Sequence, residues 1–473
     1  MWFAQQLDPD NPILKAAEYV DIRGRVDAAL LEMAVRHAVA ETEALLVCIE
    51  VVDAGVWQVV DPAMSWAFTV LDLRAATDPW GEAQRWMRDD LGRLVDLGHG
   101  PMFRIALLQV AANRFVLYSS AHHAVMDGLG FSLFIQRVSD IYTALETGQE
   151  PSRGEFGSLQ ALVADESGYQ ASERFAKDRG YWTERLGDRP AAVGLAGRLA
   201  RTSHTFLRET GAVPGEVVER LHVLGRRARV SMPSVAMAAL GVYLHRMTGA
   251  TDLTVGLPVT ARTGRVARST PGMLASVLPL RVGVRPGMSV GELLRHTSEQ
   301  ARGVLQHQRY PYEYLARELG VVGTGEHLFG PTINIMGYDP PLRFGENPAT
   351  LHNLANGPVD DLTVNVYDRS EDGTLRIDFN ANPALYTTEE NAAHHRRFVR
   401  LLQVLATADL EQPVGAVDLL SAEERHRLLV ENTDTGAAPG PAPVCLPGLF
   451  EAQAQATPEA AAVVCGDTTL SYA

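Results

Sequence analysis

Four residues in the stretch SSAHHAVMDGLGF, residues 119–131, have types and a spacing that could carry out catalysis: His122, His123, Asp127 and Gly128. A neutral imidazole can accept a proton at physiological pH. A glycine beside it lets a substrate approach the backbone closely. An aspartate four residues on can orient the ring or pair with an arginine. Such a group suits acyl transfer, in which an attacking amine or hydroxyl must lose a proton.

A metal site and a buried structural histidine are the alternatives. Adjacent strand residues point to opposite faces, so only one of His122 and His123 can face a given site. No cluster with metal-ligand spacing accompanies them, so we expect no metal. We expect His122 to be the core histidine. The second pair, His394 and His395, lies in an arginine-rich helical segment and is predicted to be solvated surface.

The elements around the first pair favour an active site. Residues 102–125 read as a hairpin whose second strand runs into the histidines, with residues 111–114 as its turn. Apolar residues at helical spacing follow between 134 and 145. The pair therefore lies between a strand and a helix, where a rigid element fixes side chains and a loop leaves them accessible.

The whole chain alternates helices and strands, which predicts an α/β (α+β) fold. A polar stretch at 164–182 separates two halves of similar character. We expect an N-terminal lobe at residues 1–175 and a C-terminal lobe at 176–428. A linker rich in Pro, Gly and Ala is expected at 429–447. The tail at 448–473 returns to helix and strand patterning and stops within an element, as in a fragment.

Composition excludes several function classes. The chain has 473 residues, 46% of them hydrophobic, and a net charge of −15. An acidic surface repels phosphate backbones, so nucleic acid is not expected as a partner. Apolar runs are shorter than the roughly 18 residues of a membrane span, and the N-terminus has no signal-peptide pattern. Three cysteines without a framework fit a reducing, cytoplasmic setting.

HHAVMDG resembles the His-His-x-x-x-Asp-Gly signature of condensation domains of nonribosomal peptide synthetases, which are relatives of chloramphenicol acetyltransferase. Four further segments resemble family motifs: MWFAQQLDPDNP, DLTVGLPVTAR, GMLASVLPLRV and HQRYPYEYLAREL (307–319). The resemblance covers residues 1 to about 428. The tail from 446 resembles the start of an adenylation domain.

The resemblance implies a V-shaped pseudo-dimer of two acetyltransferase-like lobes with a central tunnel. His123 would be catalytic and His122 mainly structural. Asp127 would form a structural ion pair with Arg281, and the Gly128 N–H would help stabilise the oxyanion. Ser276, Tyr310 and Pro311 are the candidate tunnel-lining residues.

The resemblance also implies the partners. An upstream carrier protein would bring the donor and a downstream carrier the acceptor, both on phosphopantetheine arms. The domain itself would bind no cofactor. The adjacent adenylation domain would be a further partner, and the chain would be monomeric.

Some residues depart from the family pattern and keep alternatives open. The segment RHAVAETEALLVCI is a loose version of an early motif, and Ser276 replaces a common Asn. An epimerisation domain shares the histidine signature but is not normally followed by an adenylation start. An ester-forming variant and a non-catalytic recruitment module are further alternatives; a recruitment module usually loses the signature. A heterocyclisation domain would have Asp at position 122. Whether His123 acts as a base or positions the amine stays open.

Overall fold

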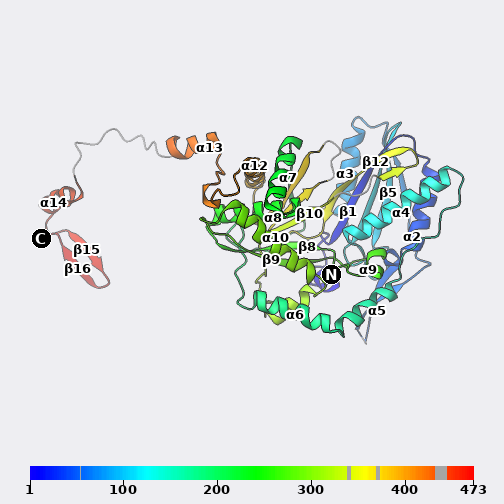
Figure 1. Ribbon diagram of the computed structural model, residues 1–473, viewed down its shortest axis with the longest axis horizontal. Coiled ribbons are helices and arrows are strands. Elements are labelled where there is room, and N and C mark those ends of the chain that lie inside the picture. The colour runs from blue at the N-terminus through cyan, green and yellow to red at the C-terminus, as the bar shows by residue number, and fades with distance from the viewer. Residues whose placement is uncertain (54, 338–341, 369–372, 432–444) are drawn as a thin grey trace. The chain divides into compact units, whose positions relative to one another are not determined.

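The computed structural model describes residues 1–53, 55–337, 342–368, 373–431 and 445–473. The chain divides into two compact units, Met1–Leu419 and Leu420–Ala473. The larger unit contains two six-stranded sheets and the helices that cover them (Figure 1). Among the described residues, no helix combines the length and the apolar character that crossing a bilayer requires.

The first sheet has the strand order β11-β12-β1-β6-β5-β4. Its central hairpin, β5 and β6, matches the predicted hairpin and turn, and β6 is buried along nearly its whole length because its residues are mainly aromatic, aliphatic or small. The strands are β1 (Lys15–Arg23), β4 (Phe68–Asp72), β5 (Phe103–Ala111), β6 (Arg114–His122), β11 (Leu342–Phe344) and β12 (Asn347–Asn356).

Helices cover both faces of this sheet. On one face α2 (Ala28–Glu41) and α4 (Gly128–Glu146) share a core with the strands. On the other face α3 (Pro79–Leu91) packs over a smaller apolar cluster. Asp27 caps α2 with its side chain, which satisfies backbone N–H groups at the helix start.

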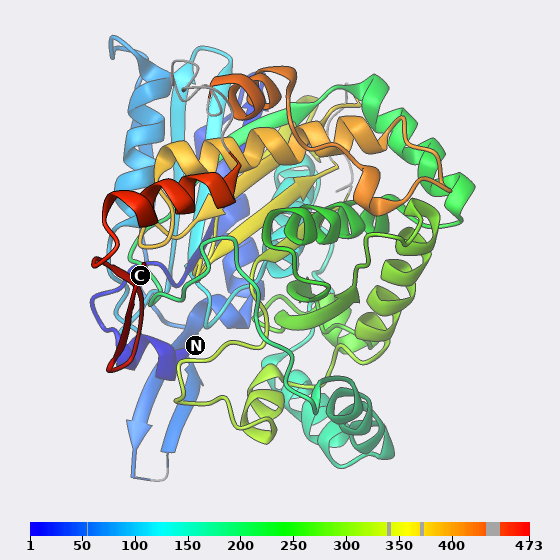
Figure 2. The ribbon, with the colours of Figure 1, turned by 90° about the vertical axis from the view of Figure 1, so that its left-hand side faces the viewer.

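A small hairpin, β2 (Val47–Val52) and β3 (Gly55–Val60), follows the 3₁₀ turn η1 (Glu43–Leu46). It projects from the larger unit (blue, Figure 2).

The second sheet has the order β7-β14-β13-β10-β8-β9. Its strands are β7 (Leu207–Val213), β8 (Asp252–Val259), β9 (Ser276–Gly283), β10 (Thr332–Met336), β13 (Leu362–Tyr367) and β14 (Leu375–Ala381). The helices that share its core are α7 (Gly215–Ala228), α8 (Met232–Thr248), α10 (Val290–Gln306) and α12 (Thr388–Leu405). Helix α8 is buried on nearly all sides because it is rich in Ala, Val and Leu, and Gly249 ends it at a φ of 76°.

The polar stretch at 164–182 forms helices rather than an open connection. It lies in α5 (Leu159–Gln170) and α6 (Glu173–Leu186), which run along the lower edge of Figure 1. The remaining short elements of this unit are α1 (Trp2–Leu7), α9 (Arg265–Ser269), α11 (Tyr312–Glu318) and η2 (Val414–Ala416).

The second half of the chain completes the first sheet. Strand β12 pairs antiparallel with β1, from Ala16 opposite Asn356 to Ile22 opposite Ala349. Strand β11 in turn pairs with β12. Residues 342–356 were expected in the C-terminal lobe at 176–428, but they extend the sheet of the N-terminal lobe.

The smaller unit contains α13 (Ala422–His426), η3 (Arg427–Glu431), α14 (Leu446–Ala456), β15 (Ala461–Cys465) and β16 (Thr468–Ser471). It begins at Leu420, ahead of the linker predicted at 429–447. Most of that linker, residues 432–444, lies outside the described residues. The expected helix and strand patterning of the tail is present.

Candidate active site

His122 ends β6 and is sealed in the core. It is 1% exposed. Its Nδ1 accepts the Ala124 N–H at 3.0 Å, so its proton lies on Nε2, which donates to Gln5 Oε1 at 3.1 Å. Burial, followed by the nearby His123, lowers the pKa of His122 to about 4. His122 is therefore neutral and fully hydrogen-bonded, and it ties the N-terminal segment to the strand end.

His123 lies one residue beyond the strand and is half-buried. Its backbone N–H donates to the Leu14 carbonyl at 2.8 Å, which fixes the chain at this point. Its Nδ1 is buried and makes no hydrogen bond of ordinary geometry. Burial lowers the pKa of His123, while Asp127 and the carbonyls of Asn356 and Met126 act to raise it. The imidazole is thus held neutral and able to accept a proton.

The chain just after β12 forms one wall of the His123 ring. Gly357 has a φ of 82°, and a Cβ there would lie 2.7 Å from His123 Cδ2 and 3.2 Å from Nε2. Its N–H donates to the Lys15 carbonyl at 3.0 Å. Only glycine fits both the backbone conformation and the ring contact. Gly357 was not predicted from the sequence, because nothing local in ANGPVD points to a residue more than 200 positions away.

Asp127 caps α4 and is 1% exposed. Its carboxylate accepts the N–H of Gly130 at 2.7 Å and those of Leu274 and Ala275, each at 2.9 Å. Arg262 Nη2 donates to both carboxylate oxygens, at 3.0 and 3.1 Å. Asp127 therefore joins the start of α4 to the segment that leads into β9.

The predicted partner of Asp127, Arg281, was wrong. Arg281 pairs instead with Asp188 and Asp252, at 2.7 and 2.6 Å. Thr254 lies opposite Arg281 in the β8–β9 pair, whereas Val259, near the end of β8, lies opposite Ser276. Five strand residues span about 16 Å, so Arg281 lies at the far end of β9. Arg262, just past β8, is at the correct end; it is the last residue of DLTVGLPVTAR, one of the segments carrying the resemblance.

Arg262 is held in place by backbone carbonyls as well as by Asp127. Its side chain is fully buried, and it donates to the carbonyls of Ala267, Thr270 and Gly272. These bonds fold the 267–272 segment around the guanidinium. The ion pair therefore organises the loop between β8 and β9 against α4.

Gly128 begins α4 and is exposed. A Cβ placed there would meet nothing within 4 Å, so open space lies beside this backbone. The first N–H groups of a helix carry a partial positive charge that favours a developing anion. Gly128 and His123 thus lie on the same strand-to-helix loop, with Asp127 turned into the protein.

The three candidate tunnel-lining residues differ in how deeply they are buried. Tyr310 is 1% exposed and packs on Phe175 in the core of the second sheet, which disagrees with a place on a tunnel wall. Its aromatic ring packs within this core, and its hydroxyl is hydrogen-bonded to Glu318. Ser276 and Pro311 are half-buried, at the start of β9 and before α11. Their role as lining residues stays a prediction.

The second histidine pair was also predicted incorrectly. His395 is 5% exposed, and its Nε2 donates to the Ile377 carbonyl at 3.1 Å. His394 Nδ1 lies 2.7 Å from the Tyr243 hydroxyl. Both rings lie on the side of α12 that faces its neighbours. In the described ranges, no group of three His, Cys, Asp or Glu side chains is arranged to hold a metal ion.

Two joined lobes, with a neutral histidine at a strand end on the loop that leads to an exposed helix N-terminus, define the architecture of a two-lobed acyltransferase. The condensation-domain family model matches residues 1–429. The chain belongs to the condensation-domain family of nonribosomal peptide synthetases, enzymes that transfer acyl groups to form amide bonds.

Similar sequences support the assignment to the condensation-domain family. The chain is 42% identical over its full length to a dimodular nonribosomal peptide synthase of Bacillus subtilis (strain 168), of which it spans 20%. It is 41% identical over 93% of its length to the isonitrile lipopeptide synthase of Streptomyces coeruleorubidus, spanning 30% of it. The chain thus spans less than a third of these relatives.

Among solved structures, the starter condensation domain of rhizomide synthetase, a mutant in complex with C8-CoA, is similar with a TM-score of 0.83 and 41% identity, over 89% of this chain and 95% of that one. The first condensation domain of the calcium-dependent antibiotic synthetase gives a TM-score of 0.82 and 35% identity, over 89% and 97%. The expected two-lobe fold is confirmed.

Proposed function

We propose that His123 promotes attack of an acceptor amine on a donor thioester, each held by a carrier protein. The observation that carries this proposal is the difference within the signature. The imidazole of His123 is neutral and half-buried on the loop that leads to the exposed Gly128, whereas His122 has both ring nitrogens hydrogen-bonded inside the core.

The chemistry follows from these positions. An α-amino group with a pKa of about 8 is largely protonated at neutral pH. When the free amine attacks the thioester carbonyl, the nitrogen gains a positive charge and must lose a proton before the thiolate leaves. Because Nδ1 of His123 is buried, Nε2 is assigned to accept that proton or to position the amine by a hydrogen bond.

The remaining groups support this step. The Gly128 N–H, at the start of α4, is assigned to the oxyanion of the tetrahedral intermediate. Asp127 is not the base, because its two oxygens already accept five hydrogen bonds, two of them from Arg262. Asp127 and Arg262 are positioning residues for the loop that carries His123 and Gly128.

The proposal also covers the partner proteins and the C-terminal tail. The donor carrier acts upstream and the acceptor carrier downstream, each with a phosphopantetheine arm, and the domain contributes no cofactor of its own. Residues 448–473 are assigned to the start of an adenylation domain. The chain is proposed to be monomeric and to work in the cytoplasm.

The donor class is proposed to include medium-chain fatty acyl groups. Support comes from the similarity to a starter condensation domain described in complex with C8-CoA, at 41% identity. The isonitrile lipopeptide synthase is a relative of comparable identity. Aminoacyl and aryl donors are the competing classes.

Intact-protein mass spectrometry tests the reaction. Octanoyl-loaded or aminoacyl-loaded donor carrier is mixed with aminoacyl-loaded acceptor carrier and this chain, wild type or His123→Ala. Transfer of the donor mass to the acceptor by wild type alone is the expected result. Equal transfer by His123→Ala would remove His123 from the mechanism.

The same samples discriminate the alternatives. A hydroxyacyl acceptor that accepts the donor while an aminoacyl one does not would identify the ester-forming variant. Uptake of deuterium at the substrate α-carbon without transfer would identify epimerisation. Neither activity with any donor would favour a recruitment module.

A further inference from the structure

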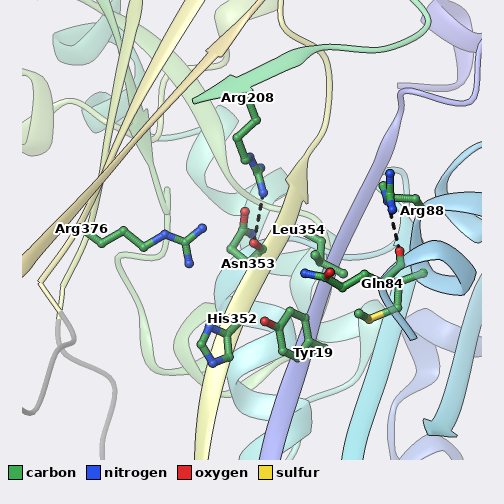
Figure 3. Close-up of a pocket in the computed structure, with 9 residues that line it drawn as sticks. Tyr19, Gln84, Arg88, Arg208, His352, Asn353, Leu354 and Arg376 are labelled. Atoms are coloured by element: carbon green, nitrogen blue, oxygen red, sulfur yellow. Dashed lines mark hydrogen bonds between the residues drawn. The ribbon is translucent and has the colours of Figure 1, made fainter. Parts of the chain in front are cut away.

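A cavity of about 280 Å³ lies on the α3 side of the first sheet, where that sheet meets the second. We call it the arginine pocket, after Arg88, Arg208 and Arg376. Arg88 comes from α3, whereas Arg208 and Arg376 come from the neighbouring strands β7 and β14. In Figure 3 the guanidinium groups of Arg208 and Arg376 point toward Asn353. His123, Asp127 and Gly128 are not among its lining residues.

Positive charge predominates among the described residues of this pocket. None of its described lining residues is an Asp or a Glu, although the chain as a whole has an acidic excess of 57 over 42. The buried carboxylate of Asp378 lies behind it and pairs with Arg376 at 2.7 Å, while Arg208 lies 3.9 Å from the same oxygen. One carboxylate therefore serves two guanidinium groups.

The hydrogen bonding of the Arg208 guanidinium is incomplete. Its Nε donates to Asn380 Oδ1 at 2.9 Å and its Nη1 to the Asn353 carbonyl at 3.4 Å, both neutral acceptors. Its Nη2 is buried without a hydrogen-bond partner. A buried donor of a charged group that lacks a partner is costly, and an anion in the pocket would remove that cost.

Arg88 supplies a third positive charge at the rim. It is exposed on α3 and donates to the backbone carbonyl of Gln84 at 3.3 Å, rather than to a carboxylate. Among the described residues, three guanidinium groups face the one carboxylate of Asp378, which leaves two positive charges. That excess matches a dianion.

Neutral donors line the floor. Tyr19 and His352, opposite each other on β1 and β12, stack with ring centroids 4.7 Å apart. Burial, followed by the charge of Arg376, lowers the pKa of His352 to about 4, so this ring is neutral at pH 7. Burial raises the pKa of Tyr19, so its hydroxyl keeps its proton. Both rings offer hydrogen bonds without adding charge.

We propose that the arginine pocket binds the dianionic phosphate group of a small phosphate monoester. Arginine forks match the oxygens of phosphate in a bidentate arrangement, and the charge excess fits a monoester better than the singly charged phosphodiester of a pantetheine arm. Since the residues come from both sheets, the bound phosphate links the two lobes. The site is separate from the proposed acyl-transfer site.

Isothermal titration of the full chain at pH 8 and low ionic strength tests this proposal, with inorganic phosphate, AMP and adenosine as probes. Saturable binding of phosphate and AMP, weakened by added salt, is expected. Equal affinities for the two would assign the interaction to the phosphate alone, and tighter AMP binding would assign part of it to the ester. Absence of binding, or equal binding of adenosine, overturns the proposal.

Variants locate the site. Arg208→Gln is expected to lower the affinity at least tenfold and Arg88→Gln several-fold. Arg85→Gln is the matched control, because Arg85 is an exposed arginine of α3 that does not line the pocket. Unchanged affinity in both Arg208→Gln and Arg88→Gln, or an equal loss in Arg85→Gln, overturns the proposal.

Two further controls keep the test decisive. Melting temperatures report whether Arg208→Gln folds; if it does not, the exposed Arg88→Gln variant decides. His123→Ala is expected to bind phosphate as wild type does. Phosphate binding and acyl transfer can therefore fail independently.

Discussion

His122 and His123 are neighbours in sequence and differ in every property that determines their chemistry. His122 has a hydrogen-bond partner for each ring nitrogen and lies in the core. His123 has a buried Nδ1 without such a partner and lies against a glycine backbone. One strand end therefore supplies both a fixed anchor and a reactive ring, because alternate residues face opposite sides.

The largest expected effect separates the two rings. His123→Ala should lower the transfer rate by about 10²–10⁴-fold, the contribution typical of general acid–base catalysis. Its melting temperature should stay close to wild type, since no strong hydrogen bond of the ring is lost. Single-turnover transfer and calorimetry measure the two quantities.

His122→Ala should lower stability more than it lowers the transfer rate. Removing the ring leaves buried groups on Gln5 and Ala124 without partners, at a cost of about 1–3 kcal/mol in unfolding free energy. A larger rate loss in folded His122→Ala than in His123→Ala would reverse the assignment.

Arg262 and Arg281 should differ in how much each stabilises the fold, because only Arg262 pairs with the buried Asp127. Arg262→Ala leaves a buried carboxylate without its counter-charge and should cost about 3–5 kcal/mol in unfolding free energy. Arg281→Ala removes partly exposed ion pairs and should cost about 1 kcal/mol or less. Denaturant unfolding of both variants is the measurement, and similar losses would contradict the placement of Arg262.

The pKa of His122 predicts an acid-dependent loss of stability. Its pKa is about 4 in the folded chain against 6.5 for an ordinary histidine. As the pH falls below 6.5, the unfolded chain binds the proton first, so stability declines between pH 6.5 and 4, by about 3 kcal/mol in total. His122→Gln should make this part of the profile shallower in urea titrations, while His352, whose pKa is also about 4, keeps its own contribution.

A second rate prediction concerns the wall of the His123 ring. Gly357→Ala places a methyl group against the imidazole and should lower the transfer rate by about 10²-fold through misplacement of the ring. Gly249→Ala is the matched control, because Gly249 has a similar φ of 76° and a Cβ there meets nothing within 4 Å. Equal rate losses would point to backbone strain rather than the ring contact.

Local patterns predicted much of this fold. The hairpin of β5 and β6, helix α4 and the helical segment that forms α12 follow from local patterns, because those signals lie within each segment. The histidine signature likewise identified His122, His123, Asp127 and Gly128.

Contacts between residues far apart in the sequence could not be predicted from these local patterns. Arg262 and Arg281 each follow an apolar run in sequence, and only the register of β8 with β9 separates them. Gly357 reaches His123 only because β12 crosses to the first sheet, and the burial of His395 depends on how α12 packs. None of these contacts has a local periodic signal.

The crossing of β12 also sets an order of events during synthesis. Strand β1 pairs with β6 on one side and with β12 on the other. On the ribosome, β1 and β6 emerge early, but residues 347–356 follow more than 200 positions later. Until then β1 has an open edge, the type of surface that recruits foreign strands. A chimera that joined two relatives near residue 175 would pair a β1 from one parent with a β12 from the other. Whether such a chimera folds would therefore depend on how well these two strands pair.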